Sequence, residues 1–141
     1  MANDINDFAR SMGIATSGLR AQAGRMRVIS ENIANADSTA STAGGDPYRR
    51  KIPTFSAQLD RTLDAQVVTM GKIKPDASAF RVKHEPGNPA ADASGNVKYP
   101  NVNPLIEMTD MRDAQRSYEA NLNIISATRR MIQRTLDILK A

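Results

Sequence analysis

The sequence predicts a mainly α fold in which two long helices at the chain ends bracket an irregular middle. The first 36 and the last 37 residues each carry one apolar stripe at heptad spacing, and all seven prolines lie from Pro47 to Pro104. Because proline breaks helix interiors, the long helices are confined to the ends. We expect an N-terminal helix over 1–36, a middle segment over 37–104 and a C-terminal helix over 105–141, with the helices packed as a coiled-coil-like pair into one helical core.

The N-terminal stripe alternates steps of four and three residues, the spacing of a helical seam. Its members are Phe8, Met12, Ala15, Leu19, Gln22, Met26, Ile29 and Ile33. Gln22 is the one polar member, and the helix is expected to stop near Asn35, where Ser, Thr and Gly follow. Gly13, Gly18 and Gly24 lie inside it, and each costs up to ~1 kcal/mol relative to alanine. They either permit the close approach of a neighbour or weaken the helix until one is present.

The C-terminal stripe is stronger and also follows heptad spacing. Its members are Met108, Met111, Gln115, Tyr118, Leu122, Ile125, Arg129, Ile132, Leu136 and Leu139, with Ala114, Thr128, Thr135 and Ile138 widening the face. Asn103 and Pro104 are predicted to be the N-cap and the first helical residue. Acidic residues (Glu107, Asp110 and Asp113) cluster near the start and basic residues near the end, which suits the helix dipole.

The middle segment is poor in residues that build a core. Of its 68 residues, 11 are Leu, Ile, Val or Phe, below the ~20% typical of globular sequence. Three apolar residues at steps of four predict a short amphipathic helix over Ser56–Val68. Alternation over Ala79–Glu85 predicts a strand, with Asn96–Tyr99 as its partner across Pro86–Gly95. The middle is therefore expected to hold one short helix and one small β-hairpin.

Composition limits the function classes. The net charge is +4 and cysteine is absent, so disulfides and thiolate metal sites are excluded. No apolar run approaches the ~20 residues of a membrane span, so the chain is predicted not to span a membrane. The N-terminus lacks the basic and apolar regions of a secretory signal, so any export is expected to proceed without a cleaved signal peptide.

The residues do not assemble a catalytic, cofactor or metal site, and neither an enzyme nor a small-molecule substrate is predicted. His84 is the one histidine and lies in a charged, strand-like stretch, where a solvated surface position is expected. The acidic residues that begin the second helix are explained by the helix dipole. Arg49–Lys51, flanked by Tyr48 and Phe55, faintly resembles a nucleic-acid platform. A solvated loop or a polar subunit contact is favoured there.

Three asparagines beside the stripes admit two interpretations. Asn32, Asn35 and Asn121 lie on segments rich in Ala and Ile. They are either surface and capping residues, Asn35 being a natural helix C-cap, or residues whose amides bond to neighbouring helices and fix their register.

The same regions carry a family resemblance. Ser17–Gln22 (SGLRAQ), followed by Asn32–Ala36 (NIANA), resembles the N-terminal motif of bacterial flagellar axial proteins. Tyr99–Met108 is similar to the approach to their C-terminal helix. Ala114–Asn121 (AQRSYEAN) is similar to that family's A-x-R-x-Y-x-A-N core. The short length and the segments Pro47–Lys51 and Val97–Val102 bring the resemblance closest to a subunit of the proximal rod.

The resemblance implies a structural subunit of the flagellar basal body, in a hollow rod that crosses the periplasm and transmits torque for motility. The implied partners are other proximal-rod subunits, the distal rod, the ring-adapter and export-gate proteins at the rod base, and the flagellar type III export apparatus. Neither a small molecule nor a nucleic acid is an implied partner. The residues expected at subunit interfaces are Leu19, Met26, Ile29, Asn32, Ile33, Asn35, Tyr48, Asn103, Pro104, Met108, Met111, Arg116, Tyr118, Asn121, Leu122, Ile125, Ile132 and Leu136.

Two alternatives remain. One is another short rod subunit of the same family. The other, from a different class, is a small coiled-coil nucleic-acid-binding protein that uses Arg49–Lys51.

Overall fold

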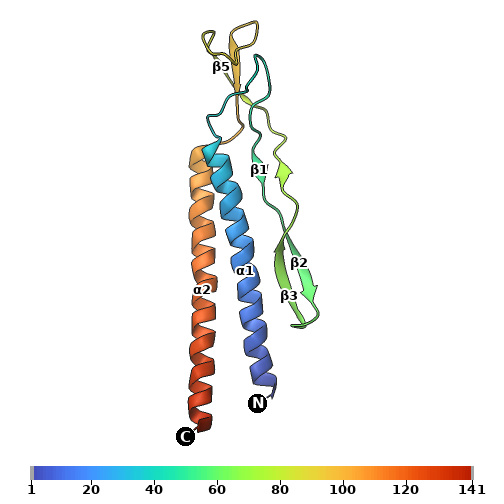
Figure 1. Cartoon of the computed structure of the whole chain (residues 1–141), viewed down its shortest axis with the longest axis vertical. Helices are drawn as coiled ribbons and strands as arrows, with labels where there is room; N and C mark the ends of the chain where they lie inside the picture. The colour runs from blue at the N-terminus through green and yellow to red at the C-terminus, as the bar shows by residue number, and fades with distance from the viewer. Residues whose placement is uncertain (1, 141) are drawn as a thin grey trace. The chain divides into compact units, whose positions relative to one another are not determined.

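In the computed structural model, which describes residues 2–140 and the burial of residues 6–138, two long helices form the chain ends (Figure 1). Helix α1 spans Ala2–Ala34 and helix α2 spans Pro104–Lys140. The described part of the middle holds β1 (Lys51–Ile52), β2 (Phe55–Asp60), β3 (Ala65–Met70), β4 (Lys74–Pro75), β5 (Arg81–His84) and β6 (Asn96–Tyr99). The predicted arrangement of two long helices around an irregular middle is confirmed.

The start of α2 is capped as the sequence predicts. Pro104 is its first residue, and the Leu105 amide donates a 3.0 Å hydrogen bond to the Asn103 side-chain oxygen. The Glu107 amide donates to the Asn103 carbonyl at 3.1 Å. The Asn103 side chain therefore satisfies the otherwise free Leu105 amide and its carbonyl accepts the first helical bond, as in an N-cap residue.

The strands form three antiparallel pairs, β1 with β4, β2 with β3 and β5 with β6. The β5–β6 pair confirms the predicted hairpin, with Arg81 opposite Tyr99 and His84 opposite Asn96. Within its connecting loop, the Asp92 carboxylate accepts bonds from the amides of Ser94 (2.8 Å) and Asn96 (2.9 Å). At Gly87, in the same loop, an added Cβ would meet nothing within 4 Å. The loop is thus ordered by its own side chains and has open space around Gly87.

The predicted helix over Ser56–Val68 is wrong, because the segment forms most of the β2–β3 hairpin. Asp60 accepts bonds from the amides of Thr62 (2.9 Å) and Leu63 (3.3 Å), which closes a turn after β2. Asp64 has a φ of 47°, a left-handed conformation that short polar residues tolerate. The Asp60 turn and the β-branched residues of β3 favour the hairpin over the helix.

The short β1–β4 pair was not predicted. Lys51 lies opposite Pro75 and Ile52 opposite Lys74. Two residues per strand are too few to produce a readable periodicity.

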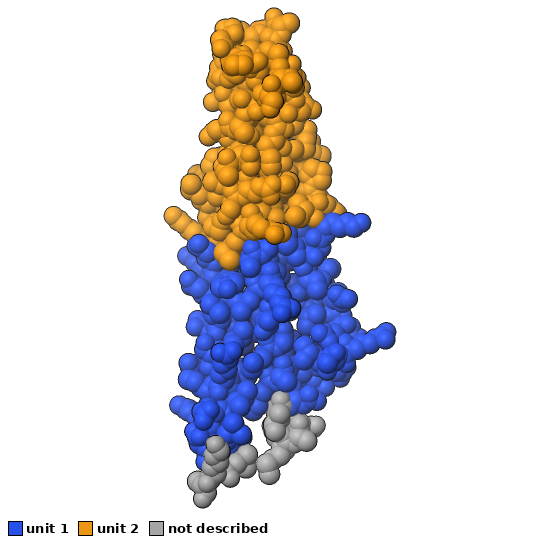
Figure 2. Space-filling model, in the orientation of Figure 1, with its two compact units in different colours: residues 1–25, 54–72, 113–141 blue, residues 26–53, 73–112 orange. Residues whose placement is uncertain are grey.

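The chain divides into two compact units, coloured separately in Figure 2. Unit 1 comprises residues 1–25, 54–72 and 113–141, and contains the β2–β3 hairpin beside parts of both helices. Unit 2 comprises residues 26–53 and 73–112, and contains the end of α1, the start of α2 and the other four strands. Each unit has a small core. Unit 1 buries Ala15, Ala21, Ala114 and Thr128, and unit 2 buries Val28, Ile29, Asn32, Ala36, Ala90, Val97, Pro100, Val102 and Glu107.

Across the described residues, no helix combines the length and the apolar character that a membrane crossing requires.

Candidate assembly site

Asn32, near the end of α1, is the centre of a buried polar network in unit 2. Its side-chain amide donates to the Lys51 carbonyl (2.8 Å) and to Glu107 Oε2 on α2 (3.1 Å). Its oxygen accepts from the Tyr48 hydroxyl (2.8 Å) and the Lys51 amide (2.9 Å). Four bonds use the full donor and acceptor capacity of an asparagine side chain. Asn32 therefore joins α1, the segment after it and α2 in one fixed geometry.

Glu107 is the charged member of this network. It is 1% exposed, and its Oε1 accepts a 2.6 Å hydrogen bond from Arg50 Nε. Arg50 also pairs with Asp76 at 3.4 Å and with Asp110 at 3.9 Å. A buried carboxylate is tolerated when a cation and hydrogen bonds compensate its desolvation, and Arg50 and Asn32 supply both. Glu107 lies in the first turn of α2, where the helix dipole favours a carboxylate, but the dipole does not account for this network.

The electrostatics of the network favour the paired state. Burial opposes the charge on Arg50, but the hydrogen bond and charge of Glu107 outweigh it and raise the pKa of Arg50. Hydrogen bonds from Ser78, aided by Arg50, lower the pKa of Asp76. Burial, with the charges of Glu31 and Glu107, raises the pKa of Tyr48 to about 12. Tyr48 is thus held as a neutral donor to Asn32.

The basic cluster Arg49–Lys51 has its partners within the chain. Arg49 donates to the carbonyls of Asp76 (2.9 Å) and Ser78 (3.1 Å), and its guanidinium lies 4.1 Å from the ring centroid of Phe80. Lys51 forms an ion pair with Glu31. The basic side chains of Arg49 and Lys51 are therefore engaged by residues of unit 2.

The other two asparagines bond to their own helices. Asn121 donates to the Ser117 carbonyl at 2.9 Å, and Asn35 donates to the Glu31 carbonyl at 2.9 Å. In unit 1, a Cβ added to Gly18 of α1 would lie 2.9 Å from the Asn121 amide nitrogen, so the glycine allows α2 to approach closely. Among the three asparagines, Asn32 alone shows a bond across to the other helix in the part of the chain described.

The buried face of α2 is lined by small and polar residues. Glu107, Ala114 and Thr128 are buried, Asn121 is half-buried, and each lies seven residues from the next. The large members of the predicted stripe flank this line. Of the predicted interface residues, Ile29 and Asn32 are buried; Leu19, Met26, Ile33, Asn35, Tyr48, Pro104, Met111, Tyr118, Asn121, Ile125 and Ile132 are half-buried; Asn103, Met108, Arg116, Leu122 and Leu136 are exposed. The repeat of small and polar residues every seven positions is the sequence signal that could have located Glu107 in the helix contact.

A second line on α2 is apolar and open to solvent. Ile124, Met131 and Ile138 recur every seven residues and are 46%, 48% and 77% exposed. Residues seven apart lie on nearly the same side of a helix. The isolated chain therefore leaves an apolar stripe uncovered on α2, a feature that marks interaction surfaces.

Comparison with known proteins identifies the family. The model described as "Flagella basal body rod protein" matches residues 12–40, and "Flagellar basal body rod FlgEFG protein C-terminal" matches residues 93–138. The flagellar basal-body rod protein FlgC of Agrobacterium fabrum is 54% identical, covering 97% of this chain and 99% of its own length. FlgC of Bacillus subtilis is 38% identical over 92% of this chain and 97% of its own length. FlgC of Aquifex aeolicus is 36% identical over 95% and 98%.

Motifs, fold and relatives agree, and the predicted absence of enzymatic activity is consistent with a structural family. The chain belongs to the flagellar basal-body rod protein FlgC family and is a structural subunit of the flagellar rod.

Proposed function

We propose that the chain is a subunit of the proximal part of the rod, which is a hollow shaft in the periplasm that transmits torque. Its neighbours are other proximal-rod subunits, the distal rod, and the ring-adapter and export-gate proteins at the base. It reaches the rod through the flagellar type III export apparatus. The short length and the match over nearly the whole length of the FlgC relatives support this position.

The main support for assembly through the helices is the exposed apolar stripe of α2, formed by Ile124, Met131 and Ile138. Residues 1–36 and 105–141 act as one helical core, and a helix of a neighbouring subunit covers Ile124, Met131 and Ile138 in a coiled-coil manner. Residues 37–104 distinguish this subunit from its relatives. Complete burial of an exposed side chain of this size contributes about 1.5–3 kcal/mol. Because Ile124, Met131 and Ile138 are 46%, 48% and 77% exposed, covering them contributes roughly half of that range or more for each, which favours association.

Gln22 on α1 also supports packing against a helix of a neighbouring subunit. It is the one polar member of the N-terminal stripe, and its Oε1 is buried with no hydrogen-bond partner among the described residues. An unpaired buried acceptor costs about 1–3 kcal/mol. Rotation of the Gln22 amide to the helix surface on assembly would let a donor from a neighbouring helix remove that cost and fix register, as a polar residue in an apolar seam does.

The stripe can be tested in cells by charge substitution. Met131→Glu and Ile138→Glu place charges on side chains that the chain itself leaves exposed, so they should abolish swimming while the protein remains abundant. Ser126→Glu, at an exposed position of α2 outside the stripe, is the matched control and should leave swimming intact. Normal motility of the double variant would contradict the proposed packing.

The position in the rod needs a separate experiment. Deleting the gene should abolish motility and leave basal bodies truncated near the inner-membrane ring. Intact rods in the deletion strain would reject the proposal. Cysteine cross-links from the natural cysteine-free chain would identify its neighbours and separate this subunit from another short rod protein.

A further inference from the structure

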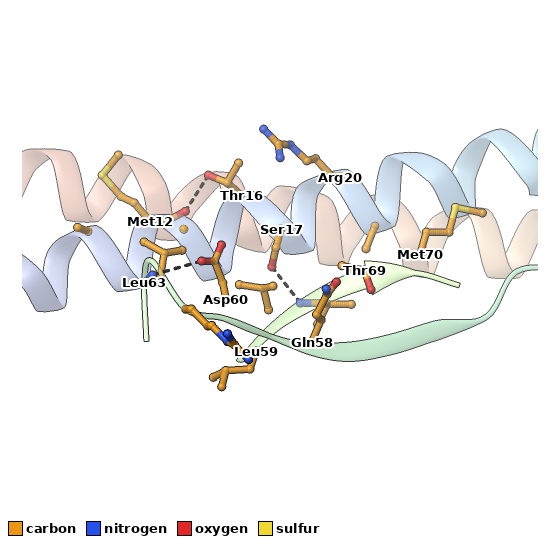
Figure 3. A pocket seen from close by; sticks show the side chains of 16 residues that line it. Met12, Thr16, Ser17, Arg20, Gln58, Leu59, Asp60, Leu63, Thr69 and Met70 are labelled. Carbon is orange, nitrogen blue, oxygen red and sulfur yellow. Dashed lines mark hydrogen bonds between the residues drawn. The ribbon is translucent and has the colours of Figure 1, made fainter. Parts of the chain in front are cut away.

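The β2–β3 hairpin lies against α1 within unit 1 and is held by polar contacts at two levels. At its tip, Arg10 Nε donates to the Leu63 carbonyl at 2.9 Å, and Arg10 Nη2 pairs with Asp64 at 3.2 Å. Farther along, the Val68 amide donates to Ser17 Oγ at 3.2 Å, a bond drawn in Figure 3. The hairpin is thus attached to one helix by bonds from both its turn and its second strand.

Two glycines of α1 receive two side chains of the hairpin. A Cβ added to Gly13 would lie 2.3 Å from Leu63 Cδ1, and one added to Gly24 would lie 2.4 Å from Met70 Sδ. Real Cβ contacts are not this short, so a side chain added at either glycine would force the flexible end of Leu63 or Met70 to move, and we call the two positions the Gly13 and Gly24 notches. The notches are eleven residues apart, close to three helical turns, and therefore lie on one side of α1.

Between the two notches, the hairpin and α1 enclose an open groove of about 950 Å³. Figure 3 shows it, with Met12, Thr16 and Ser17 on the helix and Leu63 and Met70 at its two ends. The hairpin therefore spans the groove, with Leu63 and Met70 at its two ends and the bond from Val68 to Ser17 between them. These two side chains and three polar contacts link the hairpin to α1.

Each element is weak without the other. A lone two-stranded hairpin is marginally stable in water. Each interior glycine lowers the stability of a helix by about 1 kcal/mol relative to alanine. Docking stabilises both the hairpin and α1, because the glycines that weaken α1 also leave the space that Leu63 and Met70 occupy.

We propose that the β2–β3 hairpin is an intramolecular clamp, and that seating Leu63 and Met70 in the Gly13 and Gly24 notches makes helical order in this part of α1 conditional on hairpin docking. The clamp resolves the two interpretations of these glycines: they weaken the isolated helix, and the neighbour that restores it belongs to the same chain. This part of α1 is then a continuous helix when the clamp is closed.

Amide hydrogen exchange on the purified full chain tests the clamp. Leucine is a better helix former than glycine, so Gly13→Leu should slow exchange in α1 if the notch had no role. The clamp predicts the opposite: exchange about tenfold faster at residues 10–24 of α1 and in β3, from lost docking. Ala23→Leu, at an exposed α1 position outside the groove, should leave the hairpin amides unchanged.

A compensating change separates docking from general damage. In the Gly13→Leu background, Leu63→Ala vacates the space that the new leucine needs and should restore slow exchange. Failure of this rescue, slower exchange in Gly13→Leu alone, or absence of α1 protection in the unsubstituted chain would each overturn the proposal. These outcomes are independent of rod position, which the gene deletion tests.

Discussion

Asn32 on α1 donates a 3.1 Å hydrogen bond to Glu107 on α2, and each of the two side chains is 1% exposed. This pair couples the helices of unit 2 through groups that water does not reach. Its strength depends on Arg50, which neutralises Glu107 from the opposite side. Removing Asn32 would leave Glu107 without one of its hydrogen bonds, and removing Glu107 would leave a buried donor of Asn32 unpaired.

Removing Glu107 is expected to be the most damaging single change in unit 2. Glu107→Ala should lower the free energy of unfolding by about 2–4 kcal/mol, because it removes the hydrogen bonds from Arg50 and Asn32 and leaves the Asn32 amide donor buried and unpaired, while Asp76 and Asp110 still face Arg50. Asn32→Ala should cost about 1–3 kcal/mol. Because the two share one network, the double variant should lose less than the sum, by about 0.5–3 kcal/mol. Urea unfolding of the four proteins measures this coupling, and strict additivity would show that the bond contributes nothing specific.

Tyr48 should make the free energy of unfolding fall as the pH rises above 10. Its pKa is raised from 10.0 to about 12, so the unfolded state releases the proton first as pH rises. The stabilising contribution is therefore complete below pH 10 and is lost between pH 10 and about 12. Tyr48→Phe should remove that part of the pH dependence and cost about 1 kcal/mol near neutral pH, from the lost bond to Asn32. Unfolding curves across this range check the difference; identical alkaline slopes in both proteins would refute the assignment.

Gln22 should be a residue whose replacement stabilises the isolated chain. Gln22→Met removes an unpaired buried oxygen and keeps a flexible side chain of similar length, so the free energy of unfolding should rise by about 1 kcal/mol. Swimming should nevertheless decline, because the donor on the neighbouring subunit loses its acceptor. Gln115→Met, at an exposed position of α2, is the control and should change stability little. A destabilised Gln22→Met chain would indicate that the glutamine is already satisfied in the monomer.

Asn103 should behave as a capping residue that can be exchanged for other caps. Asn103→Ala removes the acceptor for the Leu105 amide and should cost about 1 kcal/mol, whereas Asn103→Asp or Asn103→Ser should be close to neutral. Thermal unfolding followed by circular dichroism compares the three variants. Equal losses in all three would assign the effect to something other than the cap.

Sequence patterns predicted the parts of this fold that local chemistry controls. The two helices follow from their stripes, and the start of α2 follows from Asn103 and Pro104, where capping geometry is encoded in adjacent residues. The β5–β6 hairpin follows from the alternation over Ala79–Glu85, with Asn96–Tyr99 as its partner across Pro86–Gly95. Each of these depends on residues near one another in the chain, which is why one sequence suffices.

The failures share a different cause. Leu59, Leu63 and Val67 recur every four residues by coincidence, and the Asp60 turn, together with hairpin docking on α1, overrides that period. The bonds from Asn32 to Lys51 and from Arg50 to Glu107 join residues separated by 19 and 57 positions. In the sequence, the helix dipole accounts for Glu107 and a solvated loop accounts for Arg50, so neither residue indicates a partner far along the chain. Such tertiary pairs produce no periodic pattern in the sequence. The repeat of small and polar residues every seven positions on α2 is an indirect signal of the helix contact.

The open space around Gly87 makes this residue a suitable position for labelling the subunit. The chain contains no cysteine, and a side chain added at Gly87 would touch nothing within 4 Å. A cysteine introduced there would be the unique thiol of the subunit, in a loop whose own hydrogen bonds involve Asp92 and not residue 87. A fluorophore coupled at this thiol would mark the subunit at a position where the isolated chain has room for a side chain.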